Sequence, residues 1–117
     1  MLDLFKVPPK DQVLVTEAAL RLTVTRIFEK LGVTREDAAD AADVLTMTDL
    51  RGVETHGVSN MLRTYVREYR AGKLDPRPGW TIERESPGTA VIDAGQRLGI
   101  IGGPKGVALA LGKARRG

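Results

Sequence analysis

The sequence predicts a mixed α/β protein that consists of three helices, a β-hairpin and a fourth helix. Apolar residues recur at spacings of three and four up to about residue 71, and they alternate with polar residues between residues 80 and 93. An isolated hairpin is marginally stable and needs a larger sheet or a covering layer. We therefore predict an incomplete part of a larger α/β fold. Residues 1–78 would form an N-terminal arm and helical segment, and residues 79–117 would begin the sheet-containing region.

The composition excludes several classes of protein. With 117 residues, 42% hydrophobic and 28% charged, the chain is typical of a globular domain. It has no cysteine and one histidine, His56, which excludes disulfides and any metal site built from several histidines or thiolates. The net charge of +3 does not require a nucleic-acid partner. No apolar run has membrane-spanning length and residues 1–6 do not resemble a signal peptide, so we predict a cytoplasmic protein without membrane or metal.

The first helix is predicted from Thr16 to Leu31, after an extended arm. Pro8 and Pro9 disfavour a helix within residues 1–15. Thr16 is a typical N-cap residue, and Gly32 is typical of a helix end. The apolar face of this helix would consist of Leu20, Val24, Ile27, Phe28 and Leu31.

The second helix is predicted to begin after Thr34 and to fade near Arg51-Gly52. Glu36 and Asp37 would stabilise its first turn, because acidic side chains interact favourably with the N-terminal end of a helix. The residues of its apolar face are small, which would permit close approach of another helix. They are Ala38, Ala41, Ala42, Leu45 and Thr48.

The third helix is predicted over residues 56–71, with Thr55 as N-cap and Gly72 as C-cap. Its amphipathic pattern is the strongest in the chain and consists of Val58, Met61, Leu62, Tyr65, Val66 and Tyr69. This interpretation puts His56 at the N-terminal end of a helix, where backbone amides favour anions.

The chain changes character at residues 75–79, which contain two prolines and a glycine. Residues 80–85 and 89–93 read as two strands around a Ser-Pro-Gly turn. A glycine-rich link over residues 94–103 would lead to the last helix, with Pro104 in its first turn. Its apolar residues are Val107, Ala108, Leu111 and Ala114.

One stretch resembles the N-terminal signature of a known family, the malate/L-lactate dehydrogenases, which are NAD(P)-dependent and lack a Rossmann fold. The stretch is Arg51-Gly52-Val53-Glu54-Thr55-His56-Gly57-Val58, followed by Tyr65-Val66 and by Arg70-Ala71-Gly72-Lys73-Leu74-Asp75-Pro76-Arg77-Pro78. Thr89-Ala90-Val91-Ile92-Asp93 and Leu98-Gly99 extend the resemblance, which runs from about Val13 to the end. Family members are much longer, so the chain resembles an N-terminal portion.

The resemblance implies an oxidoreductase that transfers a hydride between NAD or NADP and a small 2-hydroxy or 2-oxo acid, with a homodimer as the usual assembly. In the family, most of the dinucleotide site lies beyond the part that this chain resembles. We therefore assign no cofactor-binding residues and predict that the chain alone is inactive.

His56 is the candidate catalytic residue. From the residues alone, a single histidine near a helix start is more often a polar boundary residue. The resemblance implies a proton donor, because the histidine of the family's Ser/Thr-His-Gly motif has that role, and a group that titrates near neutrality suits it. A carboxylate beside the ring would help to keep it protonated. Asp49 and Glu54 are the local candidates, and a partner from outside this chain is the alternative.

Four further residues are candidates for substrate binding: Thr55, Asn60, Arg63 and Tyr65. Thr55 would cap the third helix, contact the substrate, or both. Arg63 follows His56 by seven residues and would share its helical face, where it could hold a substrate carboxylate through two hydrogen bonds. The family usually has an arginine one turn after the histidine, where this chain has Asn60. Arg63 therefore either replaces that arginine or is merely solvated.

Two other functions are compatible with the sequence. The chain could be a non-catalytic remnant or interaction module that keeps the helical surface. It could also be a small basic DNA-binding domain with residues 34–51 and 56–71 as a helix-turn-helix, although Arg63, Arg67 and Arg70 more simply form a solvated face. The glycines between residues 95 and 106 fit neither common phosphate-binding pattern.

Overall fold

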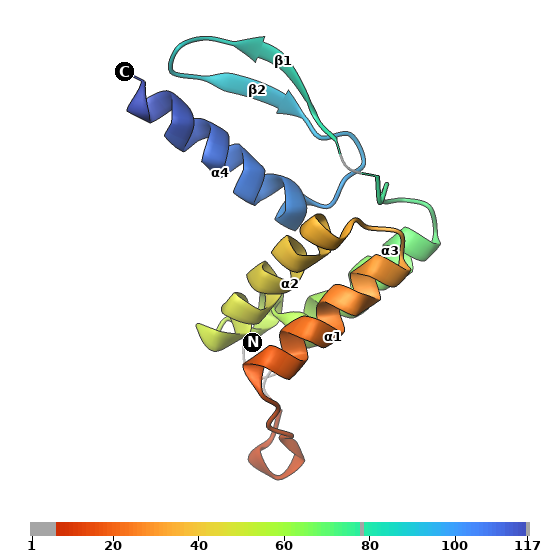
Figure 1. The fold of residues 1–117 in the computed structure, drawn as a ribbon. Coiled ribbons are helices and arrows are strands. Elements are labelled where there is room, and N and C mark those ends of the chain that lie inside the picture. Colours follow the sequence, from red (N-terminus) through yellow and green to blue (C-terminus); the bar gives the residue numbers. More distant parts are fainter. Residues whose placement is uncertain (1–6, 78, 117) are drawn as a thin grey trace.

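The computed structural model describes residues 7–77 and 79–116 and has a helical body beside a layer made of a hairpin and a helix (Figure 1). The mixed α/β arrangement confirms the predicted fold class. The elements, in order, are a 3₁₀ turn at Pro9–Asp11, α1 (Glu17–Lys30), α2 (Arg35–Leu50), a 3₁₀ turn at Glu54–His56, α3 (Val58–Arg70), β1 (Thr81–Glu85), β2 (Ala90–Asp93) and α4 (Gly99–Arg115). No helix in the described ranges is long and apolar enough to cross a membrane.

The ends of α1 and α2 follow from local sequence signals. The Thr16 hydroxyl accepts a hydrogen bond from the Ala19 amide at 3.3 Å, and the Thr34 hydroxyl accepts one from the Asp37 amide at 3.3 Å. Each of the first three helices is followed by a glycine with positive φ, a conformation that glycine adopts without strain. These are Gly32 (91°), Gly52 (73°) and Gly72 (68°). The predicted starts of α1 and α2 and the predicted ends of all three helices are confirmed.

The described part of the N-terminal arm differs from the prediction, because residues 9–11 form a 3₁₀ turn instead of an extended segment. The Asp11 amide donates to the Pro8 carbonyl at 2.8 Å. A proline at the first position of a helical turn needs no amide hydrogen there and has a suitable φ, so Pro9 is compatible with starting a turn. The apolar residues that follow lie at the surface: Val13, Leu14 and Val15 are 84%, 93% and 61% exposed.

The hydrophobic core lies mainly between the first three helices. Small residues of α2 let α1 approach closely, and the rings of Phe28 and Tyr69 meet edge to face with centroids 6.2 Å apart. From the described part of the hairpin–helix layer and the link before α4, only Leu98 and Ile101 are buried in this core. The buried apolar residues are Val24, Phe28, Val33, Ala38, Ala41, Ala42, Leu45, Tyr69, Leu98 and Ile101.

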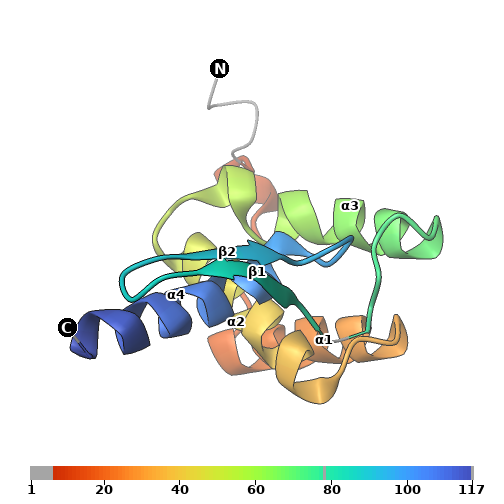
Figure 2. The ribbon, with the colours of Figure 1, turned by 90° about the horizontal axis from the view of Figure 1, so that it is seen from above.

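The two strands form the predicted antiparallel hairpin, with an irregularity in β1. Ile82 pairs with Ile92 and Arg84 pairs with Val91, so Glu83 is an extra residue on β1, a β-bulge. A bulge bends its strand and interrupts the hydrogen-bonded ladder. The hairpin lies along α4 when the molecule is seen from above (Figure 2).

Lys113 fastens the tip of the hairpin to α4. Its ammonium donates to the Ser86 carbonyl at 2.6 Å and lies 2.7 Å from Glu85 Oε1. The predicted turn is closed by the Ser86 amide, which donates to the Thr89 carbonyl at 2.9 Å. Lys113 is only 6% exposed. Its burial is compensated because the ammonium has two oxygen partners.

The last helix begins at Gly99, so the prediction of Pro104 in its first turn was wrong. The Ile101 amide donates to the Leu98 carbonyl at 2.9 Å and closes the first turn ahead of the proline. Pro104 has no amide hydrogen, and the Ile100 carbonyl therefore lacks its usual partner four residues later. Leu98 and Ile101 are buried against the helical body. Their burial stabilises a helical start that glycine and proline weaken.

Candidate active site

His56 lies at the end of the 3₁₀ turn between α2 and α3. The turn is closed by two backbone hydrogen bonds, from the His56 amide to the Val53 carbonyl at 3.1 Å and from the Gly57 amide to the Glu54 carbonyl at 3.3 Å. α3 begins at Val58, so the prediction of a helix from residue 56 was wrong by two residues. The His56 side chain is exposed, just ahead of the helix.

Asp49 explains where α3 begins. Its Oδ2 accepts a hydrogen bond from the Val58 amide at 2.9 Å, so a carboxylate from the end of α2 caps the next helix. Gly57 makes room for it, because a Cβ on Gly57 would lie 1.5 Å from Asp49 Oδ1. Thr55 is not the N-cap, which corrects the sequence interpretation.

Thr55 instead contacts the histidine ring. Its hydroxyl lies 2.8 Å from His56 Nδ1. A hydroxyl can donate or accept, so this contact is compatible with either neutral tautomer of the ring. In one tautomer Nε2 carries a proton that it can donate, and in the other Nε2 is free to accept one. Among the described residues, nothing else forms a hydrogen bond to the ring.

The local carboxylate partner that we predicted for His56 is not formed. Asp49 is held by the Val58 amide, and within residues 7–77 and 79–116 no ion pair joins His56 to Asp49 or Glu54. Asp49 therefore positions the segment that carries the histidine. The alternative, a partner from outside this chain, stays a prediction.

Asn60 also holds the 3₁₀ turn that carries His56. Its Nδ2 donates to the Glu54 carbonyl at 2.7 Å and lies 3.4 Å from the Ser59 hydroxyl. The first turn of α3 is thereby tied to the 3₁₀ turn that carries His56. Asn60 thus positions the candidate catalytic residue, and its predicted contact with a substrate stays a prediction.

Arg63 and Tyr65 are not joined to His56 by any described contact. Because His56 lies outside α3, Arg63 does not share a helical face with it, which corrects the sequence interpretation. Arg63 is exposed and has no hydrogen bond or ion pair with another described residue. Tyr65 packs against the core. Burial raises the pKa of its phenol, and the negative charge of Glu68 raises it further.

Sequence reasoning missed the roles of Asp49 and Gly57. The contact between Asp49 and Val58 spans nine residues and depends on how two helices meet, so no helical period reveals it. The one available signal was Gly57 itself, a glycine at the start of a strongly amphipathic helix, where a close contact is a common reason for its presence.

The glycines near α4 are not arranged as a phosphate-binding loop. A phosphate-binding loop needs glycines in a turn ahead of a helix, but most of those between residues 95 and 106 lie inside α4. We therefore assign no cofactor-binding residue within this part of the chain. It also contains no cluster of three or more His, Cys, Asp or Glu side chains that could hold a metal ion.

Sequence comparisons relate this chain to one family of dehydrogenases. The sequence profile of the malate/L-lactate dehydrogenase family matches residues 15–117. Malate dehydrogenase from Pyrococcus horikoshii is 42% identical over 92 residues, which are 79% of this chain and 25% of that protein. L-sulfolactate dehydrogenase from Methanocaldococcus jannaschii is 39% identical over 89 residues, which are 76% of this chain and 26% of that protein.

Solved structures agree with the sequence comparison. The structure of malate dehydrogenase from Pyrococcus horikoshii OT3 superposes with a TM-score of 0.85 at 39% identity, covering 89% of this chain and 30% of that one. Malate dehydrogenase from Entamoeba histolytica gives a TM-score of 0.83 at 28% identity, covering 87% and 28%. The chain thus spans about a quarter of the length of the curated relatives.

Proposed function

The chain belongs to the malate/L-lactate dehydrogenase family, and from this premise we propose that it forms the N-terminal portion of an oxidoreductase. The proposed enzyme transfers a hydride between NAD or NADP and a small 2-hydroxy or 2-oxo acid, with His56 as the proton donor. The observation that supports this most directly is the Thr-His-Gly segment at residues 55–57, which lies within the matched region and presents an exposed imidazole held by Thr55.

The proposed chemistry follows from the two ring nitrogens. Thr55 engages Nδ1 at 2.8 Å, so Nε2 is the atom that would exchange a proton with substrate. A bound dinucleotide would supply the hydride. His56 would donate the proton on Nε2 to the ketone oxygen of a 2-oxo acid as negative charge develops there during reduction. In the oxidation direction the same atom would accept the hydroxyl proton. Asp49 and Asn60 would keep the segment in place.

Arg63 is the proposed group that binds the substrate carboxylate. A guanidinium binds a carboxylate through two parallel hydrogen bonds, and that of Arg63 is exposed and unpaired among the described residues. Asn60, at the position where the family usually has its arginine, donates to a backbone carbonyl. The proposal therefore gives Arg63 the role of binding and Asn60 the role of positioning.

The decisive experiment joins residues 1–117 to the remaining portion of the Pyrococcus horikoshii malate dehydrogenase and measures oxaloacetate reduction. His56→Ala should lower kcat by about 10²–10⁴-fold, the usual contribution of general acid catalysis, with cofactor affinity nearly unchanged. Arg67→Ala, a change of another exposed residue of α3, is the control. A folded His56→Ala chimera that keeps most of its kcat would refute the assignment.

Arg63 is tested in the same chimera. Arg63→Ala should mainly raise KM for the acid if the guanidinium binds the carboxylate equally in the ground and transition states. Arg67→Ala should leave KM unchanged. If both variants have the KM of the parent, the carboxylate is bound elsewhere.

The 117-residue chain by itself is expected to show no NAD(P)-dependent turnover, because it corresponds to only about a quarter of the length of its relatives and, by the family resemblance, most of the dinucleotide site lies beyond that part. Turnover above that of a His56→Ala control would contradict this expectation. A cytoplasmic location and a homodimer are parts of the proposal that come from the sequence and the resemblance. Sedimentation of the chimera tests the dimer.

A further inference from the structure

A cavity of about 280 Å³ lies between the helical body and the hairpin–helix layer. It shares no lining residue with the segment 54–65 that carries His56. Its walls are largely apolar, which is typical of small-molecule sites. The apolar side chains that line it are Pro76, Trp80, Ile92, Ala94 and Ile101.

The charged side chains of the cavity leave an excess of positive charge. Arg77, Arg97 and Lys105 line it together with only two carboxylates, those of Asp37 and Asp75. Lys105 pairs with Asp37. Asp75 is bound by Arg77 at 2.8 Å, whereas Arg97 Nη2 lies 3.8 Å from the same carboxylate. The guanidinium of Arg97 is therefore the least neutralised charge.

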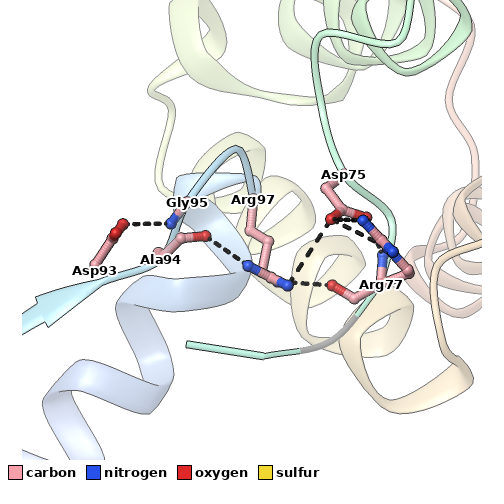
Figure 3. Close-up of polar contacts among 6 residues, drawn as sticks. All are labelled: Asp75, Arg77, Asp93, Ala94, Gly95 and Arg97. Atoms are coloured by element: carbon pink, nitrogen blue, oxygen red, sulfur yellow. Dashed lines mark hydrogen bonds and ion pairs between the residues drawn. The ribbon is translucent and has the colours of Figure 1, made fainter. Parts of the chain in front are cut away.

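Arg97 is nevertheless fixed in place (Figure 3). Its Nε donates to the Arg77 carbonyl at 2.8 Å, and its Nη1 donates to the Ala94 carbonyl at 3.1 Å. These backbone contacts orient the guanidinium without neutralising it. A charged group that is held in position before binding loses little conformational freedom when a ligand arrives.

The N-terminal end of α4 adds to the positive potential of the cavity. Gly99, Gly102 and Gly103 line the cavity, and Leu98, the N-cap residue, provides no side-chain cap. The first amides of a helix carry partial positive charge. A Cβ on Gly102 would lie 4.0 Å from the Ala94 Cβ, an ordinary contact distance, so only a side chain larger than a methyl group would fill the cavity from this position.

We propose that this cavity binds a small aromatic carboxylate, with its ring against Trp80 and Ile101 and its carboxylate toward Arg97 and the first turn of α4. The apolar walls match a ring, and the excess positive charge matches a single anionic group. The volume is near the lower end of ligand sites, about 300–1,000 Å³. This size suits a small acid and is too small for a dinucleotide.

Trp80 makes the proposal testable on the 117-residue protein, because it is the only tryptophan of the chain. Titration with benzoate at low ionic strength should change the tryptophan fluorescence saturably. Benzamide, which has the same shape without the charge, should bind about tenfold more weakly or worse, since a charged hydrogen bond is lost.

Variants connect the signal to the cavity. Gly102→Leu should abolish benzoate binding, whereas Gly106→Leu should preserve it, because a Cβ on Gly106 meets open space and the residue does not line the cavity. Arg97→Gln should weaken binding about tenfold, and Arg70→Gln on α3 should not. Circular dichroism checks that each variant is folded.

Three results would overturn the proposal. They are the absence of a saturable response in the unaltered protein, equal affinity for benzamide, and undiminished binding by a folded Gly102→Leu variant. The first two results are measured on the unaltered protein. The proposal can therefore be refuted even if a variant fails to fold.

Discussion

The helical body and the hairpin–helix layer are built from similar local signals but are stabilised differently. In the body, formed by α1, α2 and α3, the apolar faces converge on Phe28, Leu45 and Tyr69. In the layer, formed by β1, β2 and α4, four large apolar side chains stay exposed: Ile82 (43%), Val91 (43%), Val107 (59%) and Leu111 (52%). The radius of gyration, 16.3 Å, exceeds the ~13 Å typical of a compact domain of about 100 residues.

The layer thus has regular secondary structure without a hydrophobic core of its own. The layer is attached to the body by Leu98 and Ile101 and by polar contacts, such as the Lys105–Asp37 pair and the Asp75 amide, which donates to the Gln96 carbonyl at 3.0 Å. Four predictions test this difference, in order of expected effect.

The largest expected contrast is between two apolar side chains. Phe28→Ala should lower the free energy of unfolding by about 3–5 kcal/mol, because it leaves a cavity in the body. Leu111→Ala, in the layer, should change it by no more than about 0.5 kcal/mol, since this side chain is half exposed. Urea unfolding measures both. Equal losses would show that the two regions share one core.

The ion pair between α2 and α4 comes next. Lys105→Met should cost about 2 kcal/mol, because it leaves the buried Asp37 carboxylate without its hydrogen-bond partner. Adding Asp37→Asn should restore part of the loss, since the uncompensated charge is then removed. Lys73→Met, at an exposed position without an ion pair among the described residues, is the matched control. Unchanged stability in Lys105→Met would mean that polar contacts do not hold the layer.

A smaller effect is expected at the Asp49 cap. Gly57→Ala should cost about 1 kcal/mol, because the added Cβ displaces the carboxylate that caps α3. In an Asp49→Ala background the same change should cost almost nothing. Thermal unfolding of the two single variants and the double variant forms a cycle that isolates this contact. If the losses in stability of the two single variants simply add in the double variant, Gly57 does not serve to make room for the Asp49 carboxylate.

The smallest expected effect depends on pH. The hydrogen bonds from Arg77 lower the pKa of Asp75 to about 2, and Arg97 adds to the shift. Because the folded-state pKa lies below the unfolded value of 3.8, this stabilisation is present above that value and is lost as the pH falls through 2. Asp75→Asn should flatten the fall in unfolding temperature over this window. Lys113 also lowers the pKa of Glu85, so Glu85 contributes to the loss of stability at low pH in both proteins. Subtracting the unfolding temperatures of the two proteins at each pH removes this shared contribution.

Local signals made most of the fold predictable. Threonine caps and terminal glycines act within one turn of the chain, so Thr16, Thr34 and Gly32 gave the helix boundaries directly. The hairpin was predictable for the same reason, because alternation and a turn sequence are properties of neighbouring residues.

The remaining features depend on contacts between distant residues. α4 begins ahead of Pro104 because Leu98 and Ile101 are buried against the helical body, and no local pattern contains that fact. At the candidate site, His56 and Thr55 were identifiable by the resemblance. The supporting contacts of Asp49 and Asn60 became visible only once α2, the 3₁₀ turn and α3 were placed together.

The β-bulge at Glu83 makes the two free edges of the small sheet unequal as partners for a further strand. A strand with an extra residue offers an irregular row of amides and carbonyls on its free side, and β1 also carries charged side chains at residues 83–85. β2 has no bulge and carries Val91 and Ile92 at the centre of its four residues. A further strand would therefore find a regular template along β2 and a poor one along β1.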